Sequence, residues 1–233
     1  MKNKSYIGIS FIVLLFGIYA IPKIIDRVKN GTVVKMDKRT DKIQVPISKG
    51  TPSDLVKFEK VPDFSFTDQN QKRITNKDYL GKVYVVEFFF TSCPGICPKM
   101  NKNMVIVQNE YKNNPLFAIA SVSVDPKRDT PKRLKEYAQE KGATMQNWHF
   151  LTGDIDKVMN LSNKGFKLHA EENPEAEGGF EHSGLFALID KKGYIRSRKV
   201  KTGEFENPIK FYNGLDSVQV KWLIDDIQKL IKE

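Results

Sequence analysis

Residues 83–98 read V-Y-V-V-E-F-F-F-T-S-C-P-G-I-C-P, and this one segment joins a strand, a tight loop and the start of a helix. Its first eight residues are almost all β-branched or aromatic, which is typical of a strand buried on both faces. Pro94 and Gly95 then permit a tight loop, and the apolar spacing after Pro98 indicates a helix that continues to Lys112. The segment therefore predicts a strand, a loop that holds two thiols, and a helix.

Cys93 and Cys97 are the two cysteines of the chain, and they lie at the mouth of the predicted helix. Backbone N–H groups at a helix N-terminus stabilise negative charge, so a thiol placed there has a lowered pKa. The C-x-x-x-C spacing lets both sulfur atoms point to one side. The alternative is that both cysteines are merely buried in the core. The strand–loop–helix context favours redox chemistry or metal binding instead.

Strand and helix patterns alternate through the rest of the chain. Strands are expected at 61–66, 83–90, 117–124, 185–190 and 194–200, and helices at 98–112, 130–142, 154–164 and 215–231. Alternating elements imply crossover connections and helices on both faces of a sheet. A β-α-β half followed by a β-hairpin and a helix is the thioredoxin arrangement. We therefore predict an α/β, thioredoxin-like fold over residues 57–233, with a central mixed sheet.

The N-terminal segment has the composition of a membrane anchor. Residues from Tyr6 to Ile21 are almost wholly apolar, and with Ile24 and Ile25 the run reaches the length of about 20 residues that spans a hydrocarbon core. A cleaved signal peptide is the alternative, but an A-x-A-like cleavage pattern is lacking. Basic residues flank the run on both sides, so charge alone leaves its orientation open. We predict a transmembrane helix within residues 1–25 and a polar tether at 26–56.

The overall composition excludes some classes of protein. The chain has 233 residues and a formal net charge of +10, which suits one domain with an anchor. Its lysines are spread along the chain rather than clustered, so we expect no nucleic-acid partner. Attraction to an anionic membrane surface is the better interpretation of the positive charge.

The three histidines of the chain have different neighbours. His149 lies between two aromatic residues and is interpreted as a core or edge residue, whereas His169 lies in a charged stretch and is interpreted as solvated. His182 follows a Glu- and Gly-rich loop and precedes the predicted strand 185–190, where thioredoxins carry a proline beside their disulfide. An imidazole there could reach the two sulfur atoms, although chain order leaves this open. Thiolates and imidazole together would suit copper.

Several motifs in residues 57–233 resemble the Sco/SenC family of copper-binding proteins, which help to assemble the copper centre of cytochrome c oxidase. The resemblance is carried by V-P-D-F-S-F-T-D-Q-N at 61–70, F-F-F-T-S-C-P-G-I-C-P at 88–98, S-V-D-P-K-R-D-T-P at 123–131, W-H-F-L-T-G at 148–153, H-S-G-L-F-A-L-I-D-K-K-G at 182–193 and L-I-D-D-I at 223–227. Each motif alone is weak, but the set is specific.

This resemblance implies a site, a partner and a location. The copper ligands would be Cys93, Cys97 and His182. The partner would be the copper-acceptor subunit of cytochrome c oxidase. The protein would be held in the cytoplasmic membrane by a single span, with its soluble domain on the periplasmic or equivalent outer side. Asp125 would lie near the metal loop, although its position before a proline also fits a structural turn. Asp129 fits a structural role at the start of a helix.

The leading hypothesis is a copper metallochaperone that is gated by the redox state of the cysteines. The alternative is a thiol–disulfide oxidoreductase, with Cys93 and Cys97 as the redox-active pair, which would keep the cysteines of the acceptor reduced. The C-x-x-x-C spacing and His182 count against that alternative. A thiol peroxidase is a weaker hypothesis. A redox- or copper-sensing module is a further one, and the sequence does not separate sensing from delivery. Whether the protein is an enzyme stays open.

Overall fold

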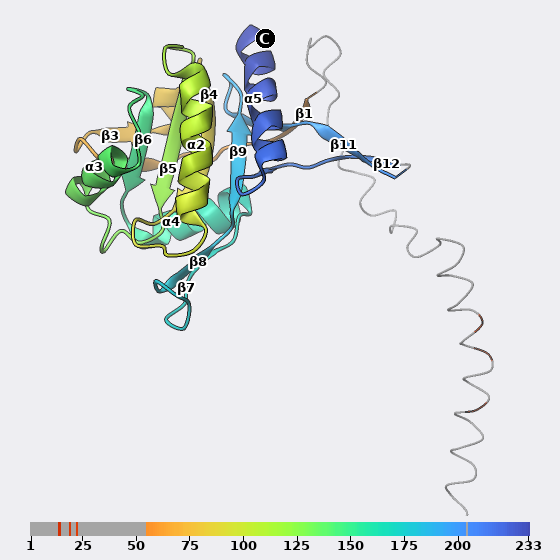
Figure 1. Ribbon diagram of the computed structural model, residues 1–233, viewed down its shortest axis with the longest axis horizontal. Helices are drawn as coiled ribbons and strands as arrows, with labels where there is room; N and C mark the ends of the chain where they lie inside the picture. The colour runs from red at the N-terminus through yellow and green to blue at the C-terminus, as the bar shows by residue number, and fades with distance from the viewer. Residues whose placement is uncertain (1–13, 15–18, 20–21, 23–54, 204) are drawn as a thin grey trace, which may run out of the picture. The chain divides into compact units, whose positions relative to one another are not determined.

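The computed structural model describes residues 14, 19, 22, 55–203 and 205–233 (Figure 1). The chain divides into two units, residues 1–44 and 45–233, and the residues from 55 onward belong to the second. The predicted anchor at 1–25 and the predicted tether at 26–56 fall, apart from residues 14, 19, 22, 55 and 56, outside the described residues. Within the described part of the chain, no helix is long and apolar enough to cross a membrane.

A mixed sheet of nine strands forms the centre of the second unit, in the order β1-β10-β9-β4-β5-β6-β2-β3 with β13 beside β9. The strands are β1 (Val56–Lys60), β2 (Ser65–Asp68), β3 (Arg73–Thr75), β4 (Val83–Phe89), β5 (Phe117–Ser123), β6 (Trp148–Thr152), β9 (Leu185–Ile189), β10 (Tyr194–Ser197) and β13 (Tyr212–Asn213). β4, β5 and β6 run parallel, whereas β9 pairs antiparallel with β4. All residues of β4 and β5 are buried, as their composition predicted.

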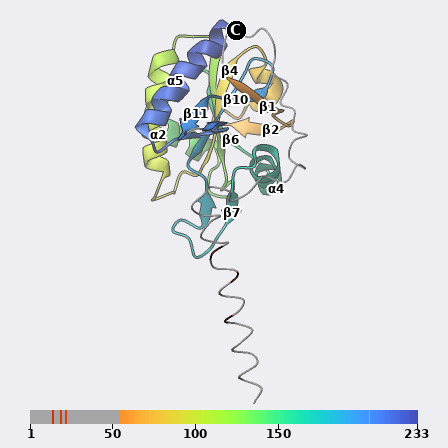
Figure 2. The ribbon, with the colours of Figure 1, turned by 90° about the vertical axis from the view of Figure 1, so that its right-hand side faces the viewer.

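Helices cover both faces of this sheet. They are α2 (Cys97–Tyr111), α3 (Pro131–Glu140), α4 (Ile155–Asn160) and α5 (Ser217–Lys232), with short turns η2 (Asn76–Tyr79) and η3 (Leu161–Phe166). Figure 2 shows α2 and α5 on one side of the sheet and α4 on the other. Phe89 of β4 packs on Tyr137 of α3, while its neighbour Phe88 points the other way and packs on Phe166. The predicted thioredoxin-like arrangement is confirmed.

Local signals explain where α3 begins and ends. Thr130 accepts a hydrogen bond from the backbone N–H of Arg133, as a helix N-cap does, and Pro131 occupies the first helical position. Gly142 has a φ of +76°, a conformation that glycine adopts without steric cost, and it lies just past the end of the helix. The boundaries of this helix therefore follow from the sequence.

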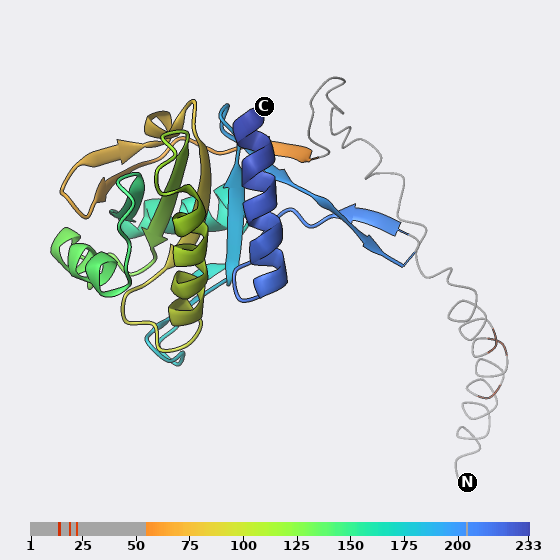
Figure 3. The same ribbon diagram turned by 45° about the horizontal axis from the view of Figure 1, so that its top comes forward.

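Other predicted elements differ from the structure. The strand predicted at 61–66 begins only at Ser65, as β2. Residues 61–64 connect β1 to β2 and include Pro62, which has no N–H to donate to a neighbouring strand. The helix predicted at 154–164 is α4 followed by the wider π-helical turn η3. The strand predicted at 194–200 stops at Ser197, and the chain then enters a separate two-stranded sheet, β11 (Lys199–Thr202) and β12 (Phe205–Pro208). Figure 3 shows this pair extending away from the central sheet.

The acidic stretch predicted as a loop before His182 is a hairpin. It consists of β7 (Ala170–Glu172) and β8 (Phe180–His182), which pair only with each other among the described strands. The hairpin lies at the end of the sheet where β4 and β5 finish (Figure 1). That end also holds the start of α2, so the hairpin is placed beside the cysteine loop.

Candidate metal centre

The loop that carries the cysteines connects β4 to α2 and is fixed at its start by a buried carboxylate. Asp129 accepts hydrogen bonds from the backbone N–H of Thr91 at 3.0 Å and from its hydroxyl at 2.5 Å. Ser123 donates a third bond to Asp129, at 2.5 Å. These bonds set the direction in which the chain leaves β4. Cys93 then lies partly exposed in the loop, and Cys97 is buried as the first residue of α2.

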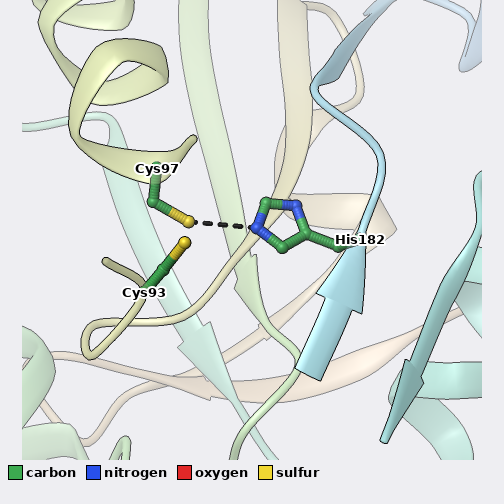
Figure 4. A group of neighbouring side chains, drawn as sticks. All are labelled: Cys93, Cys97 and His182. Atoms are coloured by element: carbon green, nitrogen blue, oxygen red, sulfur yellow. Dashed lines mark hydrogen bonds between the residues drawn. The ribbon is translucent and has the colours of Figure 1, made fainter. Parts of the chain in front are cut away.

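His182 reaches the cysteines from the end of β8. Its Nε2 atom lies 3.0 Å from the sulfur of Cys97 (Figure 4). Its Nδ1 atom lies 3.1 Å from the carbonyl oxygen of Ser183, so a proton on Nδ1 would be donated there and Nε2 would be left as an acceptor or metal ligand. The ring also packs edge-on against Phe90, with centroids 5.7 Å apart. The orientation of the imidazole is thus set from two sides.

The three predicted side chains converge on one point. Figure 4 shows both sulfur atoms and the imidazole directed toward one another, and the ligand atoms of Cys93, Cys97 and His182 all lie within 4.8 Å of each other. Bonds of about 2.0–2.3 Å from sulfur and nitrogen to one metal ion permit separations of roughly that size. Two soft thiolates and an imidazole are a donor set that could hold copper.

The two thiols differ in their affinity for a proton. The hydrogen bond from Cys97 and, to a smaller extent, the contact with His182 lower the pKa of Cys93 to about 4, against the opposing effect of burial. Cys97 shows the opposite shift, because its proton is held by Cys93 and because burial disfavours its charge, so its pKa is raised. The partly exposed thiol of Cys93 is therefore the stronger acid of the pair, and the buried thiol of Cys97 holds its proton more tightly.

A buried glutamate near the site was missed by the sequence analysis. Glu87 lies on β4, six positions before Cys93, and is fully buried. Its Oε1 accepts a 2.6 Å hydrogen bond from Ser121, which in turn accepts one from the indole of Trp148. Among the described residues, its Oε2 has no hydrogen-bond partner. Burial raises the pKa of Glu87 to about 7. The sequence feature that could have identified Glu87 is its position as a single acid inside an otherwise apolar strand.

The other candidate residues have structural partners away from the sulfur atoms. His149 lies on β6 and is partly buried, with its Nδ1 atom 3.3 Å from Asp68. His169 is exposed as predicted and lies 3.5 Å from Glu171 on the hairpin. Asp125 is buried and pairs with Arg128 in the turn after β5. The bonds that Asp129 makes to the cysteine loop were not predicted.

Comparisons with known proteins identify related sequences and structures. The sequence model of the SCO1/SenC family matches residues 53–211. The SCO1 protein homolog of Bacillus subtilis is 31% identical over 177 residues, which is 75% of this chain and 84% of the relative. The structure of BsSco, a member of the Sco family of cytochrome c oxidase assembly proteins, has 28% identity and a TM-score of 0.61, covering 74% of this chain and 94% of that one.

Yeast Sco1, solved with copper bound, is 25% identical with a TM-score of 0.56, covering 76% of this chain and 90% of its own. The family match extends over more than half of the chain and includes both cysteines and His182. We conclude that this chain belongs to the SCO1/SenC family.

Proposed function

We propose that this protein binds one copper ion through Cys93, Cys97 and His182 and delivers it to the copper-acceptor subunit of cytochrome c oxidase. The observation that carries the proposal is the convergence of two sulfur atoms and one imidazole nitrogen from three separate elements. The yeast relative was solved with copper, and BsSco belongs to a family of oxidase assembly proteins. Both facts support copper as the cargo and the oxidase as its destination.

The three ligands differ in burial, and this difference would separate binding from release. Cys97 and His182 form the inner part of the site, because Cys97 is buried and the ring is packed against Phe90. Cys93 is the partly exposed ligand, so an incoming thiolate or imidazole of the acceptor meets copper on its side of the site. Three protein ligands leave a position at which the acceptor can bind before any of them is released. Oxidation of the two cysteines to a disulfide removes two ligands and abolishes loading.

The location forms part of the same proposal. The apolar run within residues 1–25 would hold the protein in the cytoplasmic membrane as a single span, and the domain from residue 57 would face the periplasmic or equivalent outer side. The length of the apolar run supports the anchor, and the choice of the outer side follows from the proposed delivery to the oxidase. An oxidase copper centre assembled on the outer side would then lie within reach of the tether.

A second candidate function is favoured by the inequality of the two thiols. A partly exposed thiolate at Cys93 can attack a disulfide of the acceptor and form a mixed disulfide, releasing one acceptor thiolate. Cys97 then attacks the sulfur of Cys93, gives its proton to the leaving thiolate and frees the second acceptor thiol. The acceptor gains two electrons, and this protein ends as a Cys93–Cys97 disulfide. His182 is not needed as a ligand in this reaction.

A copper titration separates the two functions. The full-length reduced protein in detergent is titrated with Cu(I) against a competing chelator, as wild type, Cys93→Ser, Cys97→Ser and His182→Ala. His169→Ala is the matched control, because it removes an exposed histidine from the same hairpin. We expect each ligand variant to lose at least about tenfold in affinity and the control to lose none. Wild-type affinity in His182→Ala, together with rapid reduction of an oxidised acceptor peptide, would establish the oxidoreductase instead.

A further inference from the structure

The hairpin that carries His182 is not part of the central sheet. β7 and β8 are three-residue strands that pair with each other, with Ala170 opposite His182. A two-stranded hairpin of this length is marginally stable by itself in water. The position of His182 over the cysteines therefore depends on the contacts that hold the hairpin against the rest of the domain.

The apolar contacts of the hairpin are made with the cysteine loop. The ring of Phe180 lies 5.7 Å from that of Phe90, centroid to centroid. Gly178 has a φ of +91° and approaches Phe90 so closely that a Cβ atom at this position would lie 2.8 Å from the ring and 3.2 Å from Pro94. The hairpin tip is thus seated on the residues that flank Cys93. These contacts fix the distance between the hairpin tip and the loop. At the base of the hairpin, the side chain of Asn163 donates to the carbonyl oxygen of Ala170 at 2.7 Å and accepts from its N–H at 3.0 Å.

One charged side chain adds a polar link between the hairpin tip and the sheet. Arg128, in the turn after β5, donates from Nε to a carboxylate oxygen of Asp125 and from Nη2 to the carbonyl oxygen of Gly178. Its guanidinium carbon also lies 5.8 Å from the centre of the Phe180 ring, within range of a cation–π contact. Asp125 is 2% exposed, whereas the Arg128 side chain is 50% exposed. The link therefore has a fixed end and a solvent-accessible end.

We infer that Arg128 is a positioning residue for His182: it ties the hairpin tip to the buried carboxylate of Asp125 and so holds the imidazole over the two sulfur atoms. This inference rests on the proposed copper function. Asp125 is buried in the turn after β5 and its position is fixed there. The guanidinium that bonds to Asp125 therefore also fixes the position of Gly178, four residues before His182. A lysine carries its three donors on one nitrogen and lacks the planar fork that reaches both acceptors here.

The experiment compares wild type, Arg128→Ala, Arg128→Lys and the control Lys127→Ala, which changes the exposed neighbouring residue. Amide hydrogen exchange across residues 170–182 is measured on the reduced, metal-free full-length protein, where it reports opening of the hairpin without any copper. In parallel, each protein is loaded with Cu(I), and the rate of copper loss to excess chelator is followed.

Arg128→Ala should increase both hairpin exchange and copper loss by about tenfold, since it removes a charge-assisted hydrogen bond. Arg128→Lys should show intermediate rates, and Lys127→Ala should match wild type. If circular dichroism shows that Arg128→Ala is unfolded, Arg128→Lys decides. The inference is overturned if the deciding variant shows amide exchange in the hairpin at the wild-type rate. It is also overturned if amide exchange becomes faster while the rate of copper loss is unchanged. If His182→Ala binds copper as tightly as wild type, the proposed function is refuted instead. The exchange measured on the metal-free protein then still shows whether Arg128 holds the hairpin.

Discussion

Replacement of Glu87 by glutamine should change how the stability of the fold depends on pH. The folded protein releases the Glu87 proton near pH 7, whereas an unperturbed glutamate releases it near 4.5. Between these values the folded state binds more protons than the unfolded state, so its stability falls as pH rises. Glu87→Gln keeps an acceptor for Ser121 and carries no charge at any pH, so it removes this dependence.

The size of the effect follows from the two pKa values. A shift from 4.5 to about 7 in a fully buried group is worth about 3 kcal/mol at high pH, and about 2.5 kcal/mol of this develops between pH 5 and pH 8. Relative to wild type, Glu87→Gln should therefore gain about 2.5 kcal/mol in unfolding free energy when the pH is raised from 5 to 8.

Urea unfolding of the reduced, metal-free protein, followed by tryptophan fluorescence at both pH values, measures this difference. Glu206→Gln is the matched control, because Glu206 is exposed on β12. Its difference from wild type should stay constant with pH to within about 0.5 kcal/mol. If the difference between Glu87→Gln and wild type is also the same at pH 5 and pH 8, the carboxyl is not held protonated by burial, and the reasoning fails.

Three further predictions concern other parts of the domain. Asp226 is fully buried and accepts a 2.6 Å bond from Arg198, so Asp226→Asn should lower the unfolding free energy by about 3 kcal/mol, while the exposed neighbour change Asp225→Asn should cost less than about 0.5 kcal/mol in the same urea assay. Cys93, with a pKa of about 4, should react with iodoacetamide at a rate that is constant from pH 6 to pH 8, and Cys97→Ala should move its titration upward; a wild-type rate that rises tenfold per pH unit would contradict this. Copper affinity of the reduced protein should fall as the pH is lowered from 7 to 5, because protons compete for thiolate and imidazole ligands; an affinity independent of pH would count against those ligands.

The sequence was sufficient for the main layers of the fold and for the cysteine loop. β4 and β5 are long apolar runs, and α3 has an N-cap, a first-turn proline and a terminal glycine, so each carries its own local signal. His182 could be proposed from its place before β9 and from the family resemblance. Its distance from Cys97 depends on the tertiary structure, which chain order does not supply.

The parts that the sequence did not reveal depend on contacts between distant segments. β7 and β8 have three residues each and no period long enough to recognise, and they are held by Phe90, Arg128 and Asn163. The environment of Glu87 requires the register of β4 against β5, which places Ser121 opposite it. A strand composition predicts burial, but it does not identify the partner of a polar residue within the strand.

The long separation of the ligands along the chain has a consequence for how the protein is made. Cys97 and His182 are 85 residues apart, and they meet only after the sheet between them has assembled. A bound ion would therefore act as a reversible cross-link that closes about half of the domain into a loop, and the unfolded chain would have to lose considerable conformational entropy to form it. Copper binding should thus raise the melting temperature in proportion to the logarithm of free copper, and a newly synthesised chain should bind copper only when it has finished folding.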